Sequence, residues 1–246
     1  MDSETRGADA YFPERTLARF LSRRGDATTV YTFEKGGVAP VREGYAHLVQ
    51  SLGLDAIVLV DGGTDILLRG NEANLGTPEE DATSLAAVAS LEVPTRIVTC
   101  VGFGIDTFHG VCHANWLENV AALAAERAFL GATALLPQMS EVRLYVDAVS
   151  DADVATPSRP SIVNGSIVSA IEGRFGDYHR GRRTRGSKLF ISPHMSLLWA
   201  FDLPAVARRN LYLERLALTQ SIWDVQLAIE ESHAGAQIRP REPIPH

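Results

Sequence analysis

Short apolar runs alternate along the chain with longer segments whose apolar residues recur every three or four positions. The runs at 55–60 and 96–101 have strand length, and in the first of them apolar side chains occupy successive positions, as in a strand covered on both faces. Segments 41–52, 77–91 and 116–129 have helical spacing. This alternation predicts a Rossmann-like, three-layer α/β fold with a mostly parallel sheet and helices on both faces.

Weaker patterns complete this outline. Segment 13–21 has helical spacing, and 28–33 is rich in β-branched and aromatic residues, as strands are. Two prolines and small polar residues predict a surface loop at 151–160. The remaining predictions are helices at 162–172, 204–216 and 219–232 and a strand at 188–191. The pattern therefore predicts a single domain over residues 1–236, followed by a loose tail at 237–246.

Composition narrows the class of protein. With 246 residues, 46% of them hydrophobic, the chain is long enough to bury a sizeable core. Its formal net charge of −7 argues against a nucleic-acid partner, because duplex-binding proteins present a basic face. Cys100 and Cys112 are too few for a disulfide framework, which favours a reducing compartment. No apolar run has the length of a membrane span, so we expect a cytoplasmic protein without a membrane partner.

The richest polar stretch follows the run at 55–60 and reads Asp61-Gly-Gly-Thr-Asp65-Ile-Leu-Leu-Arg69-Gly-Asn-Glu72. In open α/β sheets, ligands bind beyond the carboxyl ends of strands, where this stretch is predicted to lie. Asp61 and Asp65 can coordinate a hard cation such as Mg²⁺ or Ca²⁺, orient a hydroxyl-rich ligand or act as general bases. Glycines permit close approach of a ligand to main-chain amides, and arginine can hold an anionic group. The candidate ligand-binding residues are Gly62, Gly63, Thr64, Arg69, Glu72 and Asp81.

The same acids have a simpler interpretation as structural residues. Aspartates before glycine often cap turns, and the acids at 79–81 would be favoured by the dipole of a helix that begins there, by about 0.3–1 kcal/mol each. Thr77 and Pro78 form a typical helix start. Asp81, however, is followed by small and apolar residues, which would place it near the sheet edge. The sequence leaves both interpretations open.

A second polar turn follows the run at 96–101. Gly102 and Gly104 again allow close backbone approach to a ligand, and Asp106 again comes just after a strand. A complete GxGxxG fingerprint is absent, since Thr107 stands at the position of its third glycine. Hydride transfer from a dinucleotide is therefore less favoured than hydrolysis or proton abstraction.

Histidines are the candidate proton-transfer groups. His109 and His113 have the i, i+4 spacing of zinc ligands, but the residues between them include a glycine and no glutamate, unlike the HExxH motif. A histidine that lines a pocket is therefore favoured over a metal pair. His194 follows the predicted strand at 188–191 and is a third candidate at the same sheet edge. The predicted catalytic residues are Asp61, Asp65, Asp106, His109 and His194.

Four arginines lie between positions 180 and 185, with a glycine among them. Such a loop can act as a lid that grips an anionic ligand through its guanidinium groups, and Arg180 and Arg183 are the candidates for this contact. A solvated basic loop is the alternative. The sequence does not decide between these two interpretations.

Several motifs occur together in a known family. They are Tyr11-Phe-Pro-Glu14, Val60-Asp-Gly-Gly-Thr-Asp65, Arg69-Gly-Asn-Glu72, Leu75-Gly-Thr-Pro-Glu-Glu-Asp81, Gly102-Phe-Gly-Ile-Asp106, Ile171-Glu-Gly173 and Trp199-Ala-Phe-Asp-Leu203. Over most of its length the chain resembles the prokaryotic family named domain of unknown function 1152 (DUF1152). The resemblance implies a Rossmann-like α/β fold and does not supply a reaction.

The resemblance also raises an expectation about the N-terminus. Members of that family begin with a strand and a glycine-rich turn before the Tyr11-Phe-Pro-Glu14 motif, and this chain starts almost at that motif. We therefore expect the glycine-rich βα unit to be missing, and part of a phosphate-type pocket with it. A fainter similarity of Asp61-Gly-Gly-Thr-Asp65 to a segment of D-glutamate cyclases favours an amino-acid ligand.

Together these features favour an enzyme of the hydrolase or lyase type that acts on a small polar or anionic metabolite, with Asp61 and Asp65 as ligands of an assisting divalent cation. Two alternatives use the same residues. A non-catalytic nucleotide or metabolite sensor would bind without turnover, whereas a scaffold subunit would pair Asp61 with Arg69 and leave no cavity beside them. The apolar faces at 211–218 and 222–229 can pack on the sheet or form a homodimer contact.

Overall fold

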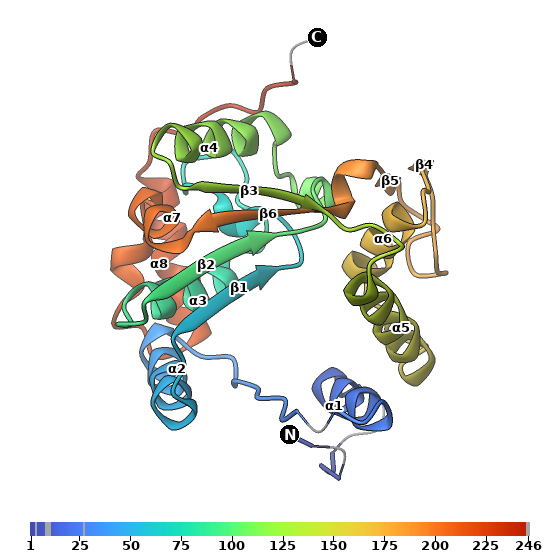
Figure 1. The fold of residues 1–246 in the computed structure, drawn as a ribbon. Coiled ribbons are helices and arrows are strands. Elements are labelled where there is room, and N and C mark those ends of the chain that lie inside the picture. The colour runs from blue at the N-terminus through green and yellow to red at the C-terminus, as the bar shows by residue number, and fades with distance from the viewer. Residues whose placement is uncertain (3, 8–10, 27, 245–246) are drawn as a thin grey trace. The chain divides into compact units, whose positions relative to one another are not determined.

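The computed structural model describes residues 1–2, 4–7, 11–26 and 28–244. The chain divides into two compact units: the first comprises residues 1–32 and 134–196, and the second comprises residues 33–133 and 197–246 (Figure 1). The sequence prediction of one domain over 1–236 did not anticipate this division. Two of the three crossings fall where no linker composition marks a boundary, since the chain passes from one unit to the other inside β3 (Phe129–Ala134) and directly before β6 (Leu197–Asp202).

The second unit is built on a sheet that has four strands among the described residues. In sheet order these are β1 (Ala56–Asp61), β2 (Thr95–Cys100), β6 (Leu197–Asp202) and β3 (Phe129–Ala134). β1 and β2 are parallel, whereas β2 and β6 are antiparallel. The sheet is therefore mixed, and a mostly parallel sheet is not confirmed. The sequence analysis did not predict β6, whose insertion between β2 and β3 changes the strand directions.

Helices pack beside this sheet. They are α2 (Val38–Leu52), α3 (Glu79–Ala89), α4 (His113–Ala125), α7 (Leu203–Arg209) and α8 (Ile222–Ala234). α3 contacts β1, α2, α7 and α8 (Figure 1). α2 ends as predicted at Gly53, whose φ of 63° suits glycine. α7 and α8 begin with side-chain caps, since Asp202 accepts from the amide of Ala205 and Ser221 forms a capping box with Asp224.

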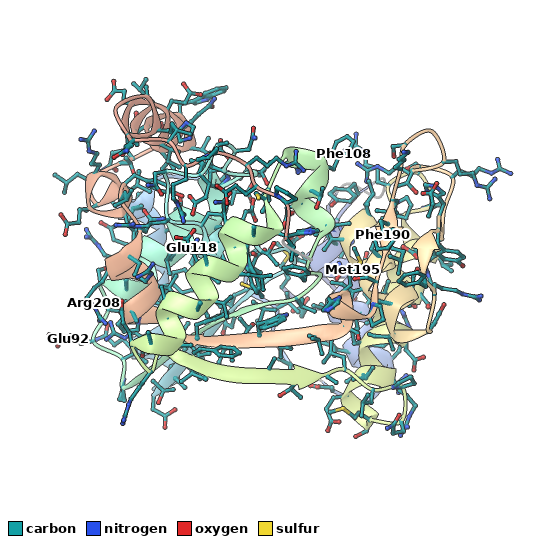
Figure 2. The ribbon with its side chains drawn as sticks, turned by 90° about the horizontal axis from the view of Figure 1, so that it is seen from above. Glu92, Phe108, Glu118, Phe190, Met195 and Arg208 are labelled. Atoms are coloured by element: carbon teal, nitrogen blue, oxygen red, sulfur yellow. The ribbon has the colours of Figure 1, made fainter. Side chains whose placement is uncertain are left out.

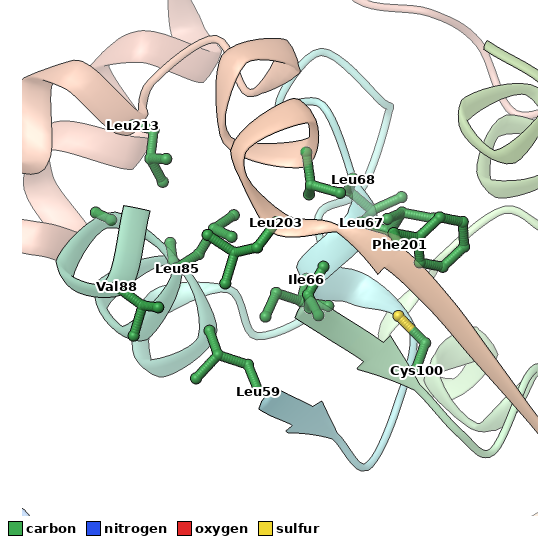
Figure 3. Packing of buried hydrophobic residues seen from close by; sticks show 14 of the residues in the cluster. Leu59, Ile66, Leu67, Leu68, Leu85, Val88, Cys100, Phe201, Leu203 and Leu213 are labelled. Atoms are coloured by element: carbon green, nitrogen blue, oxygen red, sulfur yellow. The ribbon is translucent and has the colours of Figure 1, made fainter. Parts of the chain in front are cut away.

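The core of the second unit joins α3 and α7 to one side of the sheet. Leu85 of α3 and Leu203 of α7 are fully buried and belong to one cluster with Leu59 of β1 (Figure 3). The alternate residues of β1 on its other face are exposed, since Val58 is 51% and Val60 is 64% exposed. β1 is thus not covered on both faces as its apolar run predicted, and the three-layer arrangement is not confirmed.

The first unit contains α1 (Pro13–Arg23), α5 (Ser140–Ala155), α6 (Ile162–Ile171) and the short antiparallel pair β4 (Gly176–Asp177) and β5 (Phe190–Ile191). α1 packs against α5, and two surface ion pairs join Arg23 to Asp151 and Arg24 to Asp147. α6 packs against a 3-10 helix, Pro193–Ser196, in which Met195 is buried. Phe190 of β5, which precedes this helix in the sequence, is exposed (Figure 2).

Several predicted boundaries are wrong for identifiable reasons. The segment 28–33 forms no regular strand, and α5 continues to Ala155 into the predicted loop. The helix predicted at 116–129 ends at Ala125, because Arg127 has a left-handed φ of 59° and the chain then enters β3. The helix predicted at 204–216 is divided by a turn in which Asn210 accepts from the amide of Tyr212. None of the helices in the described part of the chain has the length and apolar character of a membrane-spanning helix.

Candidate functional site

Four aspartates from separate elements of the second unit come together. Asp61 ends β1, Asp65 begins the 3-10 helix Asp65–Leu67, and Asp81 lies in the first turn of α3. Asp106 lies in the turn that follows β2, the parallel neighbour of β1. One carboxyl oxygen from each of Asp61, Asp65 and Asp81 lies within 4.8 Å of the other two. The structure therefore assembles acids that the sequence placed at two strand ends and one helix start.

Main-chain amides orient two of these carboxyl groups. Asp65 Oδ2 accepts a hydrogen bond from the amide of Thr77 at 2.7 Å. Asp106 Oδ2 accepts from the amide of Thr64 at 2.7 Å and from its hydroxyl at 3.1 Å. These bonds use one oxygen of each group, so the other oxygen can bind a ligand. Sequence reasoning missed this role of Thr77, whose side chain was expected to cap α3.

Two glycines allow the loops to approach the carboxyl groups closely. A Cβ atom on Gly63 would lie 2.8 Å from Asp106 Oδ2 and 3.2 Å from Asp61 Oδ1. At Gly76, where φ is +75°, a Cβ atom would lie 2.2 Å from Asp65 Oδ2. A side chain at either position would therefore displace the carboxyl groups. Gly63 was predicted to admit a ligand to the main chain, and in the structure it makes room for the aspartates.

Within the described residues, no arginine or lysine forms an ion pair with any of the four aspartates. Burial and then the neighbours Asp81, Asp65 and Asp106 raise the pKa of Asp61 to about 9. Burial and then Asp65 and Asp106 raise the pKa of Asp81 to about 8. Because buried charges are unfavourable without a partner, these groups hold protons at neutral pH unless a cation replaces them.

The other two carboxyl groups are shifted in the same direction. Burial and then the charge of Asp65 raise the pKa of Asp106 to about 6, against the hydrogen bonds from Thr64. Burial raises the pKa of Asp65 above its ordinary value, against the hydrogen bonds from Thr77. A carboxyl group that titrates near neutral pH is suited to general acid–base catalysis, and Asp106 meets that condition.

The predicted histidines lie in different surroundings. His109 is exposed, and its charge lowers the pKa of both Asp65 and Asp106, so it lies near the cluster. His113 has its Nε2 atom 2.9 Å from the Thr107 hydroxyl, and its ring packs on another aromatic side chain. His109 and His113 belong to no candidate metal group among the described residues. His194 lies in the 3-10 helix Pro193–Ser196 of the first unit.

The remaining predicted glycines have local roles. Gly102 and Gly104 have φ values of +89° and +96°, which gives the turn after β2 a shape that favours glycine. Gly62 is exposed next to the aspartates. Arg69 forms no ion pair with Asp61 within the described residues, and its Nε atom is buried without a hydrogen-bond partner. The Asp61–Arg69 pair that a scaffold role predicted is thus not formed.

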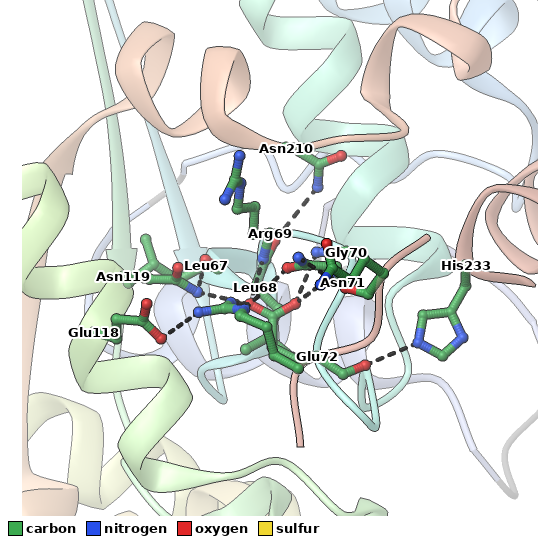
Figure 4. A network of polar contacts seen from close by, with 12 residues as sticks. Leu67, Leu68, Arg69, Gly70, Asn71, Glu72, Glu118, Asn119, Asn210 and His233 are labelled. Atoms are coloured by element: carbon green, nitrogen blue, oxygen red, sulfur yellow. Dashed lines mark hydrogen bonds and ion pairs between the residues drawn. The ribbon is translucent and has the colours of Figure 1, made fainter. Parts of the chain in front are cut away.

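Glu72, also predicted to bind a ligand, is instead at the centre of a network of the chain's own groups (Figure 4). Its side chain is 1% exposed and accepts from the amides of Arg69 at 2.9 Å and Gly70 at 2.8 Å. Asn119 Nδ2 donates to it at 2.9 Å, and Arg239 forms an ion pair with it at 2.5 Å. Burial alone would raise the pKa of Glu72, but the hydrogen bonds outweigh burial and lower it.

This network also holds the C-terminal segment. The amide of Arg239 donates to the carbonyl of Asn71 at 2.7 Å, and its guanidinium also pairs with Glu118 of α4. Cys112 Sγ lies 3.1 Å from the carbonyl oxygen of Glu242. The segment at 237–242, which composition predicted to be loose, therefore has defined contacts.

Cavities are present in both units of the described part of the structure. One, of about 510 Å³, belongs to the first unit and is lined by Arg180 and Arg183 among others. The second, of about 440 Å³, lies between His113 and the segment 241–244. Neither is lined by any of the four aspartates. The dimensions of the acidic cluster are given by its carboxyl oxygens, since one oxygen from each of Asp61, Asp65 and Asp81 lies within 4.8 Å of the other two.

These features define an α/β protein in which carboxyl oxygens gather beyond two parallel strands. Carboxyl oxygen is the ligand type that hard divalent cations prefer. A family model described as "Protein of unknown function (DUF1152)" matches residues 5–236, and the chain belongs to this family. The resemblance drawn from the sequence motifs is thereby confirmed. No match is found among curated proteins, and none among solved structures.

Proposed function

We propose that this protein binds a divalent cation through Asp61, Asp65 and Asp81, and acts with it on a small polar or anionic metabolite. One observation carries the proposal: three carboxyl oxygens lie within 4.8 Å of one another, largely buried, with no ion pair to a basic side chain among the described residues. Carboxylate oxygens are the usual protein ligands of Mg²⁺ and Ca²⁺. A cation would balance charges that the chain leaves unbalanced.

The turn-cap interpretation does not account for this arrangement. α3 begins at Glu79, and its N-cap residue Pro78 provides no side-chain hydrogen bond, so Asp81 does not cap this helix. Asp61 accepts only a long hydrogen bond of 3.4 Å, from the amide of Ile66. A carboxyl group buried for a structural purpose normally has stronger partners than this, since an unpaired buried charge is strongly unfavourable.

The chemistry of the surrounding groups supports a hydrolase or lyase. A bound cation supplies a Lewis acid that polarises a carbonyl or phosphoryl oxygen or lowers the pKa of bound water. Asp106 has a pKa of about 6 and can accept a proton near neutral pH. His109 is exposed beside it and can exchange that proton with solvent. The metabolite would contact the exposed side of the cluster, at Gly62 and His109.

The Rossmann-like fold, the cytoplasmic location and the homodimer contact that the sequence predicted are part of the same proposal. The parallel pair β1 and β2, joined through α3, is a βαβ arrangement and supports a Rossmann-like fold. Cys100 and Cys112 both have free thiols, which supports a reducing, cytoplasmic location. The homodimer contact that the apolar faces at 211–218 and 222–229 can form stays a prediction.

The test is a turnover assay on protein freed of metal with a chelator. Phosphate esters, amides and amino acids would be screened with Mg²⁺, Mn²⁺ or Ca²⁺ added back. Asp61→Asn removes a cluster ligand, and Asp55→Asn is its control, because Asp55 is an exposed aspartate just before the same strand. We expect turnover that needs the cation, is lost in Asp61→Asn and is kept in Asp55→Asn. Cation binding without turnover of any compound would favour the sensor instead.

A further inference from the structure

We propose that the first unit contains a second ligand site, which binds a small molecule that carries a phosphate monoester on an apolar body. The site is the cavity of about 510 Å³ between the end of α5, the start of α6, the loop at 178–184 and β5. All of its lining residues belong to the first unit. Its volume falls within the range of small-molecule sites in proteins, roughly 300–1,000 Å³.

One side of the cavity is basic. Arg180, Arg182 and Arg183 line it, whereas Asp153 is its single acidic lining residue among those described. Arg180 is already neutralised, since it pairs with Glu172 at 3.0 Å and lies 3.8 Å from Asp153. The positive charge available to a ligand therefore comes from the other two arginines.

Arg182 and Arg183 keep most of their donors for a ligand. Arg183 donates through Nη1 to the carbonyl of Pro160 at 3.1 Å, which positions its guanidinium at the cavity wall. Arg182 has no ion pair and no side-chain hydrogen bond within the described residues. A guanidinium presents five donors in a plane and binds a phosphate through two parallel hydrogen bonds.

The start of α6 adds fixed positive potential on the same cavity. Ser161 caps the helix by accepting from the amide of Asn164 at 3.2 Å, and Ser161 and Ile162 both line the cavity. The preceding amides of the helix have no intrahelical acceptor, and the helix dipole places partial positive charge there. Helix starts combined with arginines are a common setting for phosphate groups.

The rest of the lining is suited to an apolar body. Leu189 and Pro157 contribute apolar surface, and Ile191 is buried behind the lining. The hydroxyls of Ser166 and Ser169 donate to carbonyls of their own helix at 2.7 Å, so they are not available as donors to an anion. The lining thus combines basic side chains with apolar surface, which favours a ligand with an anionic group on an apolar body.

A phosphate monoester fits this lining better than a carboxylate. It carries a charge of about −1.5 to −2 at neutral pH and three acceptor oxygens, which two unpaired arginines and a helix start can satisfy together. A carboxylate carries one charge and would leave part of the basic wall unbalanced. The site rests on residues of the first unit alone and does not depend on cation binding by the aspartates.

The test is calorimetric titration of the full-length chain with phenyl phosphate, inorganic phosphate and benzoate at one fixed ionic strength. We expect phenyl phosphate to bind at one site per chain, more tightly than either of the other two. Arg182→Gln and Arg183→Gln should each weaken it by about tenfold or more, because each removes a charge-assisted contact. Arg185→Gln is the matched control, since Arg185 lies in the same loop outside the cavity lining, and it should change affinity less than about threefold.

Three results would overturn the proposal. They are the absence of saturable phenyl phosphate binding, an equal loss in Arg185→Gln, and benzoate binding as tight as that of phenyl phosphate. Arg182 and Arg183 are exposed, so their substitution leaves the core intact. Asp61→Asn should leave phenyl phosphate affinity unchanged, which separates a failure of this site from a failure of the cation site.

Discussion

Two buried acidic sites lie a few residues apart in the second unit, and they balance their charge in opposite ways. Glu72 is surrounded by main-chain amides, Asn119 and Arg239, and its pKa is lowered. Asp61 has other carboxyl groups as its neighbours, and its pKa is raised to about 9. Among the described residues, the chain thus supplies an arginine and several hydrogen-bond donors to Glu72, but only one long hydrogen bond, from the amide of Ile66, to Asp61. This difference supports the proposal that the aspartate cluster takes its counterion from solution, whereas the network around Glu72 is satisfied by the chain's own groups.

The largest predicted effect is the loss of stability on substitution of Glu72. Glu72→Ala should lower the free energy of unfolding by about 3–5 kcal/mol, because it leaves Arg239 without its buried partner and two amides without an acceptor. For a chain of this size that corresponds to a fall in melting temperature of roughly 10 °C. Thermal denaturation followed by circular dichroism measures it. A change below about 1 kcal/mol would mean that the Glu72 network is not structural.

The second prediction is an increase in stability. Asp61→Asn should stabilise the metal-free protein by about 2 kcal/mol at pH 8, since an amide replaces a carboxyl group that must keep a proton among like charges. The same substitution should abolish stabilisation by Mg²⁺ or Ca²⁺. Thermal denaturation with chelator and with cation measures both effects, and Asp55→Asn serves as the control. Destabilisation of the metal-free protein would contradict the proposed charge imbalance.

The third prediction concerns pH. Asp61, Asp81 and Asp106 have raised pKa values in the folded chain, so the folded state binds more protons than the unfolded state. Stability of the metal-free protein should therefore fall as pH rises from about 4 to about 9, the range between the ordinary and the raised pKa values. Cation affinity should rise over the same range, because the cation displaces protons. Melting temperatures with and without Mg²⁺ should diverge as pH rises; a constant gap would contradict this.

The smallest effect should come from Gly63→Ala. The added Cβ would lie 2.8 Å from Asp106 Oδ2, so the carboxyl groups must move apart and cation affinity should fall by about tenfold. Gly186→Ala is a suitable control, because a Cβ there has no neighbour within 4 Å. Calorimetric titration with Mn²⁺ compares the two variants, and equal affinities would show that Gly63 does not fix the cluster.

The sequence predicted the acids of the cluster because their signals are local. Asp61 and Asp106 each follow a strand and adjoin glycines, and Asp81 precedes a run of small residues that predicted a buried helix. Such patterns are visible within a few positions of the chain. They indicated where carboxyl groups lie, and parallel pairing of β1 and β2 then brings them together.

The sequence did not show which of these acids has partners elsewhere in the chain, and such partners distinguish a structural acid from a candidate ligand site. Glu72 lies in the same polar stretch as Asp61 and looks equally suited to bind a ligand. Its partner Arg239, however, lies 167 positions away in a segment predicted to be loose. The hydrogen bond from the amide of Thr77 to Asp65 depends on tertiary geometry as well. The mixed sheet was missed for a related reason, because the direction of β6 follows from long-range packing and not from its own residues.

The most direct test of the central claim is calorimetric titration of metal-free protein with Mg²⁺ and Mn²⁺ at pH 8. We expect one bound cation per chain and release of protons, which shows as a binding heat that changes with the ionisation enthalpy of the buffer. Binding should be lost in Asp61→Asn and Asp81→Asn and unchanged in Asp55→Asn. Absence of saturable binding in the parent, or equal binding in Asp61→Asn, would contradict the claim that the aspartate cluster takes its counterion from solution.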